Sequence, residues 1–199
     1  MAHEILRPGI YDLVQALAGL SRFRAHLAGE IAARDSDSPV LDLGGGTGLY
    51  RSLWSSDATF VCLDPDMANL RRARERTPRM QILQASGENL PFSSGFFECV
   101  LIASVAHHLS TSLFTSVLAE CSRVLKPRGR LIFVDPVWDP GRWRGRALWW
   151  LDRGEYPRTP DALKQALQGS FELEHWETFV IQHRYALAVG RPKSAGVVY

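Results

Sequence analysis

Residues 40–50 read Val40-Leu41-Asp42-Leu43-Gly44-Gly45-Gly46-Thr47-Gly48-Leu49-Tyr50, and this stretch decides the fold. An apolar strand breaks there into glycines at every second position, and a helical pattern follows. A strand that turns over Gly44, Gly46 and Gly48 leaves no β-carbons at the turn, so a ligand can lie against bare backbone. The stretch therefore predicts a site for a nucleoside-containing cofactor.

The glycine spacing narrows the choice of cofactor. Dinucleotide-binding folds use G-x-G-x-x-G, in which the third glycine lets helix and strand pack closely and the helix N-terminus meets a pyrophosphate. The spacing here is G-x-G-x-G. A phosphate-binding loop needs Lys followed by Ser or Thr after the glycines, and Leu49-Tyr50 stand there instead. Phosphate binding at this turn is therefore disfavoured.

Length and composition indicate an ordinary globular chain. With 199 residues, 46% of them hydrophobic and 22% charged, it can bury one substantial core, so we expect residues 1–199 to form a single domain. A formal net charge of +2 is too small to imply a nucleic-acid partner by itself. No run approaches the ~18 apolar residues of a membrane span, and no basic region leads into an apolar stretch at the N-terminus.

The cysteines indicate a compartment. Cys62, Cys99 and Cys121 are odd in number, far apart and without C-x-x-C spacing, so neither a disulfide framework nor a zinc site is expected. We interpret them as buried small hydrophobic residues in a reducing compartment and expect a cytoplasmic protein.

Apolar runs alternate with helical patterns along the chain. Strands are expected at Val40–Leu43, Thr59–Leu63, Met80–Leu83, Cys99–Ala103 and Leu131–Val134, separated by stretches long enough for crossover helices. One helical pattern runs from about Tyr11 to Ile31, and a second begins at Asp64-Pro65-Asp66 and has an apolar face opposite a run of arginines. A third runs from Ser112 until Lys126-Pro127-Arg128-Gly129 ends the helix, and a short fourth lies near Asp161–Leu167. Strands that are apolar throughout indicate a parallel sheet covered on both faces.

The chain after residue 170 predicts a different strand connection. Two strand-like runs, Phe171–Val180 and Arg184–Val189, are separated by too few residues for a crossover, so an antiparallel hairpin is expected. The expected fold is thus α/β, with a mostly parallel, seven-stranded sheet.

Asp64 is the second candidate for cofactor binding. It ends the second expected strand, 20 positions after Gly44. An acid about 20 residues past a glycine turn can accept hydrogen bonds from both ribose hydroxyls, a role common to several nucleoside cofactors. A helix cap for the segment at Asp66 is the alternative interpretation, and it is compatible with the first.

At this point the chain resembles the class I S-adenosylmethionine (SAM) methyltransferases. Their first motif is an acid followed by G-x-G-x-G, which Asp42 to Gly48 match, and the resemblance continues in order to about residue 135. It extends through Ser86-Gly87-Glu88-Asn89-Leu90-Pro91-Phe92, Phe96 to Ala103, and Glu120 to Leu131. Arg128 replaces a family glycine in the last segment, where Glu120 and Arg123 can pair on the helix.

The resemblance implies a Rossmann-like, doubly wound fold and SAM as cofactor, with S-adenosylhomocysteine as product. It also implies that Asp42 helps to hold the amino group of the cofactor and that Ser86 takes a position where the family has an acid for the adenine amino group. A hydroxyl accepts that bond less strongly than a carboxylate. The candidate cofactor-binding residues are Asp42, Gly44, Gly46, Gly48, Asp64, Pro65, Ser86, Gly87, Glu88 and Ala103.

The pair His107-His108 follows the fourth expected strand, where open α/β sheets bind their ligands. An imidazole has a reference pKa near ~6.5, which suits a general base, so His107 is the candidate catalytic residue. The alternative is a loop histidine satisfied by backbone carbonyls. Adjacent residues point in different directions, so no metal site is expected.

Two segments are expected to act as lids over this edge of the sheet. The first is the N-terminal helical segment, about residues 1–35. The second is the Trp- and Arg-rich insertion at about residues 136–160, whose side chains can select a substrate or simply pack over the sheet edge. Residues 152–160 add Arg, Glu and Tyr side chains that could face the transferred methyl group.

The pattern as a whole predicts a methyltransferase that acts on a small molecule by direct displacement. One alternative is a catalytically silent SAM-binding protein, favoured by Ser86 and the absence of an obvious base. Another is an NAD(P)-dependent oxidoreductase, although no tyrosine here is followed four residues later by lysine. A nucleic-acid methyltransferase is less favoured, because this chain lacks the Asn/Asp-Pro-Pro-aromatic segment at the fourth strand that holds a flipped base. The acceptor and the oligomeric state are left open.

Overall fold

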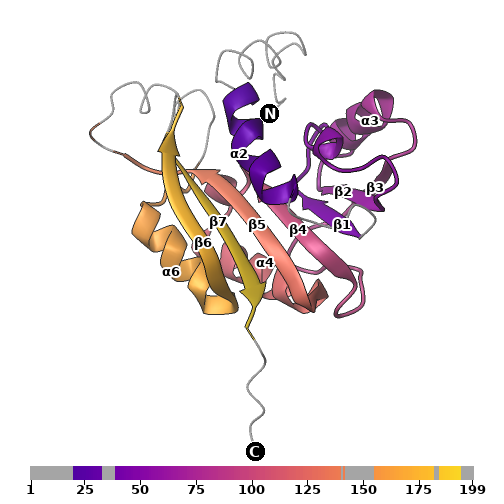
Figure 1. Ribbon diagram of the computed structural model, residues 1–199. Coiled ribbons are helices and arrows are strands. Elements are labelled where there is room, and N and C mark those ends of the chain that lie inside the picture. The colour runs from indigo at the N-terminus through magenta and orange to yellow at the C-terminus, as the bar shows by residue number, and fades with distance from the viewer. Residues whose placement is uncertain (1–19, 33–38, 140, 142–154, 182–183, 194–199) are drawn as a thin grey trace, which may run out of the picture.

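The computed structural model describes residues 20–32, 39–139, 141, 155–181 and 184–193 (Figure 1). The strands of this part are β1 Val40–Leu43, β2 Phe60–Asp64, β3 Gln81–Gln84, β4 Phe97–Ala103, β5 Leu125–Pro136, β6 Phe171–Val180 and β7 Arg184–Pro192. Its helices are α2 Leu20–Ala32, α3 Met67–Arg76, α4 Thr111–Val124 and α6 Pro160–Ser170, with 3-10 helices η1 Arg51–Leu53 and η2 Ala106–His108. Most of both expected lids lies outside these residues.

The seven strands form one sheet in the order β3-β2-β1-β4-β5-β7-β6. Neighbours from β3 to β5 pair in parallel, and β7 is antiparallel to both β5 and β6. The expected sheet and its C-terminal hairpin are confirmed. The classical dinucleotide-binding sheet has the order 3-2-1-4-5-6 and lacks this inserted antiparallel strand, which removes support from the oxidoreductase alternative.

The register of the strands gathers the predicted site at one edge. Leu43 of β1 lies beside Leu63 of β2 and Ile102 of β4, so the residues that follow these three strands emerge together. Winding reverses between β1 and β4, and open α/β sheets bind ligands outside the carboxyl ends of strands at this switch point. The glycine turn, Asp64 and the segment after Ala103 therefore share one edge of the sheet.

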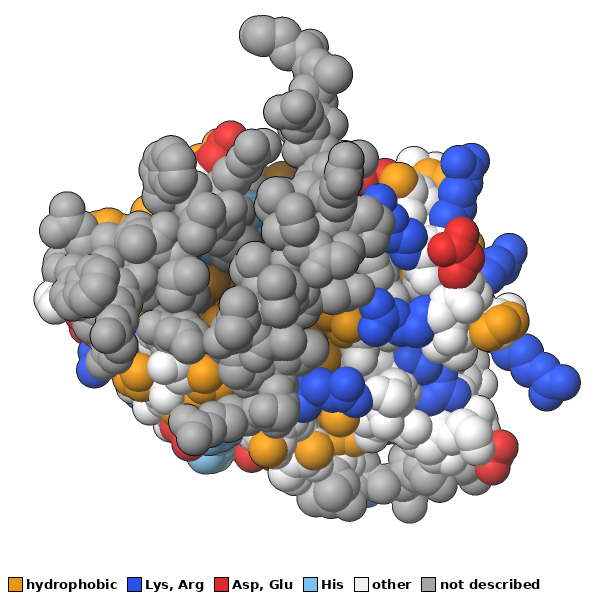
Figure 2. Space-filling view, turned by 90° about the horizontal axis from the view of Figure 1, so that it is seen from above, with side chains coloured by type: hydrophobic (Ala, Val, Ile, Leu, Met, Phe, Trp, Pro, Cys, Tyr) orange, Lys and Arg blue, Asp and Glu red, His pale blue; other side chains and the backbone are white. Residues whose placement is uncertain are grey.

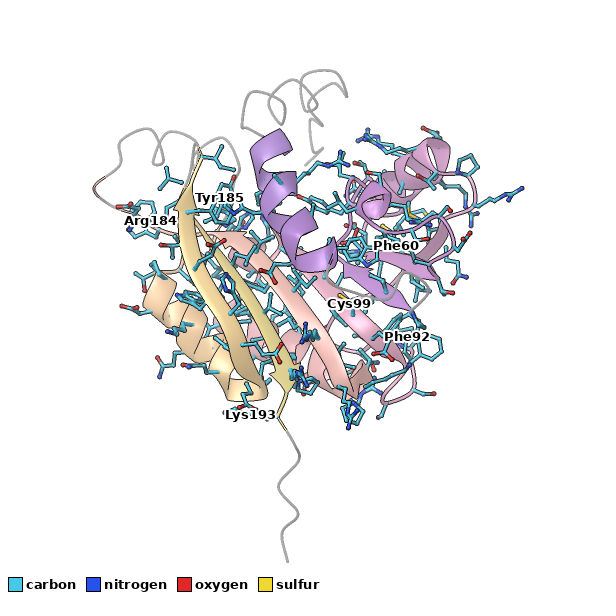
Figure 3. All side chains as sticks on the ribbon, viewed as in Figure 1. Phe60, Phe92, Cys99, Arg184, Tyr185 and Lys193 are labelled. Carbon is cyan, nitrogen blue, oxygen red and sulfur yellow. The ribbon has the colours of Figure 1, made fainter. Side chains whose placement is uncertain are left out.

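Helices cover both faces of the sheet (Figure 1). On one face α4 and α6 supply Phe114 and Leu163 to a core that also holds Leu41. On the other face α2 and α3 pack on a second core, which includes Phe60 and Cys99 (Figure 3). Side chains of successive strand residues alternate between the two faces, which is why a parallel sheet covered twice needs strands that are apolar throughout.

Short polar side chains begin three of the helices. Asp66 accepts from the backbone N–H of Ala68, Ser110 from that of Leu113 and Thr159 from that of Ala162. Each bond satisfies one of the four donors that a helix start leaves unpaired. The starts expected near residues 66, 112 and 161 are confirmed to within two residues.

The helix expected directly after the glycine turn is not formed. Turns continue to Tyr50, and only η1 follows before β2. Gly44, Gly46 and Gly48 have φ of +69°, +54° and +70°, which a right-handed helix cannot contain. Arg51 then donates to the carbonyls of Trp54, Ser55 and Ser56 and ends the segment as a closed loop.

The connection from β3 to β4 also lacks the expected crossover helix, since residues 85–96 form turns. Glu120 and Arg123 pair on α4, as the sequence predicts, and the same pair also holds this loop. Arg123 bonds to Glu120 and donates to the carbonyls of Leu90 and Phe92 at 2.9 and 2.8 Å, and Glu120 accepts from the Leu90 N–H at 2.8 Å. These contacts, in place of a helix, support the segment that the sequence predicts at the adenine.

The segment Lys126-Pro127-Arg128-Gly129 was expected to separate the α4 helix from the fifth strand. The helix ends two residues earlier, at Val124, and β5 begins at once. The register slips there, because Phe97 pairs with Leu125 but Cys99 pairs with Arg130. The proline and glycine thus form an irregularity inside β5, and Pro at a bulge costs no ladder hydrogen bond.

We expect Arg123→Gln to lower the free energy of unfolding by about 1–2 kcal/mol, because two carbonyls and Glu120 lose a charged donor. The Arg123 side chain is 36% exposed, so water replaces part of the loss. Urea titration measures the change. Arg128→Gln removes the same charge from an exposed position and should change stability by less than about 0.5 kcal/mol. Equal effects of the two variants would contradict the role of Arg123.

Candidate active site

The glycine turn closes β1 and folds back on β2. The backbone N–H groups of Gly44 and Gly45 donate to the carbonyl of Leu63 at 2.7 and 3.1 Å. A β-carbon on Gly44 would lie 2.5 Å from the side chain of Val105, which follows β4. The turn therefore packs tightly against the start of the segment that contains His107.

Gly46 differs from the other glycines of the turn. Among the described residues, no atom lies closer than 4.0 Å to the position of its missing β-carbon, whereas a β-carbon on Gly48 would lie 2.5 Å from Met80. Gly46 therefore leaves room at the turn, which suits the ligand expected there. Its N–H donates to Asp64 at 3.0 Å, and the Cys62 thiol lies 3.8 Å from its carbonyl oxygen.

Asp42 lies beneath the turn and is 1% exposed. Neither of its carboxylate oxygens has a hydrogen-bond partner among the described residues. Burial first, and then the charge of Asp64, raises the pKa of Asp42 to about 7. A buried carboxylate without a donor is unfavourable on its own, so Asp42 fits a cationic group such as the ammonium that SAM carries.

Asp64 is 7% exposed at the end of β2. One oxygen accepts from the N–H of Gly46, and the other accepts from the N–H of Asp66 at 2.8 Å and from the Asn69 amide. Burial raises the pKa of Asp64, and these hydrogen bonds oppose the rise. Each carboxylate oxygen has two lone pairs, so Asp64 supports α3 and retains acceptor capacity for a ribose hydroxyl.

The segment expected at the adenine follows β3. Gln84 pairs with Asp64, and its side chain donates to the carbonyl of Pro65 at 2.9 Å, so Ser86–Glu88 begin beside the end of β2. Ser86, Glu88 and Pro65 are exposed. A β-carbon on Gly87 would lie 3.2 Å from Val117, which fixes that backbone against the core. Ala103, by contrast, is buried in the core on the α2 side.

Ser104, directly after β4, has φ of +58°. Its N–H donates to the carbonyl of Val134 at 2.9 Å. A left-handed serine is an uncommon and costly conformation, and such residues gather at functional sites. The sequence carried no signal for it, because serine has no preference for this geometry.

Asp135 in β5 binds the segment that holds His107. Its carboxylate accepts from the backbone N–H groups of Ala106 and His107 at 3.0 and 3.1 Å. The Nδ1 of His107 lies 3.1 and 3.2 Å from the two carboxylate oxygens. Both side chains are at most 2% exposed. Since a carboxylate only accepts, we assign the proton to Nδ1 of His107.

Comparison with known proteins agrees with this geometry. A family model described as "Methyltransferase domain" matches residues 41–133. The chain is 44% identical over 109 residues to the uncharacterized methyltransferase YodH of Bacillus subtilis strain 168, covering 52% of this chain and 46% of YodH. The matched segment, residues 41–133, belongs to the class I SAM-dependent methyltransferases.

A second relative of this methyltransferase is the ubiquinone/menaquinone biosynthesis C-methyltransferase UbiE of Pseudomonas savastanoi pv. phaseolicola. The two are 30% identical over 137 residues, which cover 63% of this chain and 53% of UbiE. The matched part thus spans about half the length of both relatives. Among solved structures, the PH0226 protein of Pyrococcus horikoshii OT3 has a TM-score of 0.73 at 20% identity, covering 87% of this chain and 90% of that one. That likeness shows the fold.

Arg158 of the methyltransferase stabilises the His107 segment. It donates to the carbonyls of Ala106 and Leu109, both at 2.6 Å, and lies over the ring of Phe114. Burial lowers the pKa of Arg158, and the charge of Asp135 opposes the change. The guanidinium is thus engaged by backbone, and the expectation that it faces the methyl group receives no support.

Asp135 is a residue of the site that sequence reasoning missed, although an acid that interrupts an apolar run at the carboxyl end of a strand is a usable signal.

Within the described residues, no three His, Cys, Asp or Glu side chains lie together as metal ligands. Across those same residues, no helix has the length and apolar character needed to cross a bilayer.

Proposed function

We propose that this chain binds SAM at the glycine turn and transfers the methyl group to a small-molecule acceptor. The observation that carries the proposal is Asp42, a buried carboxylate to which none of the described residues donates, beneath a turn where those residues leave room at Gly46. Residues 1–199 act as one domain in this proposal, and the three buried cysteines, which form no disulfide, support a cytoplasmic location.

The proposed cofactor-binding residues contact different parts of SAM. Asp42 holds the amino group, Gly44, Gly46 and Gly48 leave room for the amino-acid tail, and Asp64 accepts from the ribose. Pro65, Ser86, Gly87, Glu88 and Ala103 border the adenine and the methyl-transfer edge. SAM supplies a sulfonium-bound methyl group, which a nucleophile aligned behind it can displace; alignment and exclusion of water are the tasks of the protein.

His107 is the proposed base. Asp135 holds the proton on Nδ1, so the lone pair that can accept a proton is on Nε2. Because His107 is 2% exposed, it can act only on an acceptor that enters at the carboxyl end of β4. A small acceptor suits this burial, and the name of the relative UbiE supports the same class.

Calorimetry tests cofactor binding. We expect SAM and S-adenosylhomocysteine to bind and NAD+ not to bind. Asp64→Ala should weaken SAM binding about 10- to 100-fold, since hydrogen bonds to a charged acceptor are each worth about 1.5–3 kcal/mol. Asp57→Asn, which removes an exposed carboxylate elsewhere, is the matched control. Absence of SAM binding would overturn the proposal.

Transfer of a radioactive methyl group from SAM to a panel of phenols, quinols and amines tests catalysis. His107→Gln should abolish turnover while SAM affinity stays within about twofold. Tight SAM binding without turnover on any acceptor would instead favour the catalytically silent SAM-binding protein. The exposed Ser86, at the position expected near the adenine, is the residue that favours this alternative.

A further inference from the structure

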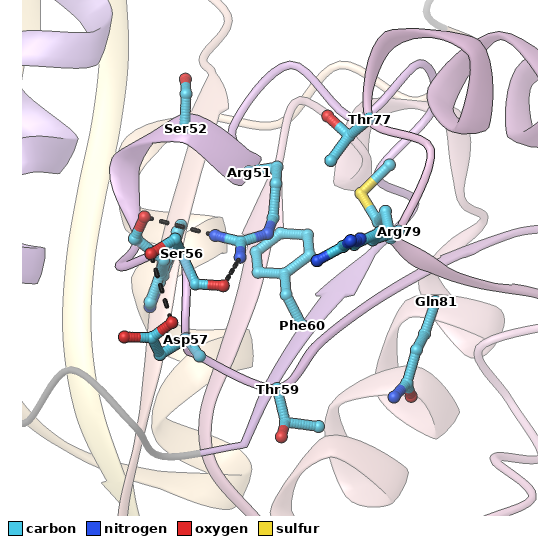
Figure 4. Close-up of a pocket in the computed structure, with 12 residues that line it drawn as sticks. Arg51, Ser52, Ser56, Asp57, Thr59, Phe60, Thr77, Arg79 and Gln81 are labelled. Atoms are coloured by element: carbon cyan, nitrogen blue, oxygen red, sulfur yellow. Dashed lines mark hydrogen bonds between the residues drawn. The ribbon is translucent and has the colours of Figure 1, made fainter.

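A cavity of about 570 Å3 opens at the amino ends of β2 and β3, the edge opposite the glycine turn (Figure 4). Its wall includes Arg51, Arg79, Phe60, Thr59, Thr77 and Gln81. This volume falls within the range of about 300–1,000 Å3 that is typical of small-molecule sites. The proposed methyltransferase chemistry uses none of these side chains.

Arg51 is held in place by its own loop. Its guanidinium donates to the carbonyls of Trp54, Ser55 and Ser56 at 3.2, 2.7 and 2.9 Å. It also lies 5.4 Å from the centre of the Phe60 ring. A guanidinium has five N–H donors, so two are left for a ligand. Because the side chain is already ordered, binding a ligand costs it little further conformational entropy.

Arg79 approaches the same ring from another side. Figure 4 shows the guanidinium groups of Arg51 and Arg79 directed toward Phe60, on either side of its ring. Neither arginine forms an ion pair with a carboxylate of the described residues. Asp57, the acid in the wall, is bonded to Ser56 instead. Two cations that share a cavity and pair with none of the described carboxylates repel each other, and an anion between them removes that cost.

The chemistry of the wall favours a phosphate group. Arginine forks match phosphate oxygens in two-point contacts, and Thr59, Thr77 and Gln81 add neutral donors. Exposed Arg71, Arg74 and Arg76 of α3 lie just before this edge in sequence. Figure 2, seen from above, shows basic side chains on one side of the molecule with acidic side chains among them. At the cavity itself, two guanidinium groups favour a dianion over a single carboxylate.

We infer that this cavity binds a small phosphate-bearing molecule between Arg51 and Arg79, independently of the cofactor at the opposite edge. Phe60 forms the floor under the two guanidinium groups, and the remaining volume takes the organic part of the ligand.

Inorganic pyrophosphate is a probe for this site. We expect the arginine side-chain NMR signals of the full chain to shift saturably during a pyrophosphate titration at constant ionic strength, with a dissociation constant in the millimolar range or below. Arg79→Gln should weaken binding about tenfold, the effect of removing one charged donor. Arg51 is unsuitable as the first variant, since three carbonyls depend on it.

Arg128→Gln is the matched control, because it removes the same charge from an exposed position in β5. SAM affinity, measured for each variant, reports on folding and on the other edge. A second variant, Thr77→Val, should weaken pyrophosphate binding and leave SAM binding unchanged. A non-saturable titration, or an equal loss in Arg79→Gln and Arg128→Gln, would overturn the inference. Pyrophosphate binding in a chain that does not bind SAM would leave it standing while the proposed function fails.

Discussion

Asp42→Asn should weaken SAM binding about 100-fold at pH 7.5. The carboxylate is 1% exposed and has no other partner among the described residues, so its charge is available to the ammonium of the cofactor. Loss of one charged hydrogen bond in a buried site costs about 1.5–3 kcal/mol, and leaving an ammonium unpaired adds to this. Titration calorimetry measures the change, with Asp57→Asn as the control that keeps wild-type affinity.

The same variant should alter the pH dependence of stability. Burial raises the pKa of Asp42 from 3.8 to about 7, so between these values the folded chain without ligand binds more protons than the unfolded chain. The contribution of Asp42 to the free energy of unfolding therefore falls as the pH rises from about 4 to about 7. At pH 8 Asp42→Asn should be more stable than wild type, by at most about 4 kcal/mol.

The pH dependence of cofactor affinity has the opposite direction. Asp42 must lose its proton before it pairs with an ammonium, so SAM affinity should fall by up to about tenfold per pH unit below pH 7. Calorimetry at pH 5.5–7.5, in buffers of different ionisation enthalpy, would also detect the released proton. Equal slopes for wild type and Asp42→Asn would contradict the role of Asp42.

Gly45→Ala should destabilise the protein by about 2–3 kcal/mol, more than Gly46→Ala. A β-carbon on Gly45 would lie 2.6 Å from the Asp42 carboxylate and 2.7 Å from the Cys62 sulfur. On Gly46 it would meet no described residue closer than 4.0 Å, and only the left-handed backbone would cost about 1–2 kcal/mol. Urea titration of the two variants without ligand compares them directly.

The double variant Gly45→Ala/Cys62→Ala identifies the cause. Removing the sulfur relieves one of the two close contacts, so the two substitutions together should cost about 1 kcal/mol less than the sum of their separate effects. Strict additivity, or a larger cost for Gly46→Ala, would show that the Gly45 contacts are not limiting.

Sequence alone was sufficient where chemistry and local geometry coincide. The glycines at 44, 46 and 48 were expected to form an abrupt turn after the first strand, and the structure places all three in that turn with a positive φ. Asp64 was expected both as a ligand-binding acid and as a support for the next helix, and its bonds to Gly46 and Asp66 are compatible with both. The alternation of apolar strands and helices predicted the sheet, because period and length are local properties.

Only the tertiary structure decided what depends on partners distant in sequence. Gly45 stands at a variable position of the motif, yet it faces Asp42 and Cys62 across the turn. Asp135 meets His107 from 28 residues away, and Arg123 reaches Leu90 from 33 residues away. The helix expected after the glycine turn is absent for a local reason, because the positive φ of the three glycines and the carbonyls that Arg51 binds close the loop first.

The chain by itself thus determined the sheet, the glycine turn and the acids that line it, since each follows from backbone preferences or hydrophobic period within a few residues. Packing determined which acid receives no hydrogen bond from the described residues, which histidine nitrogen carries the proton and where two arginines converge. Those properties depend on burial and on long-range neighbours, which exist only once the sheet has brought distant segments together.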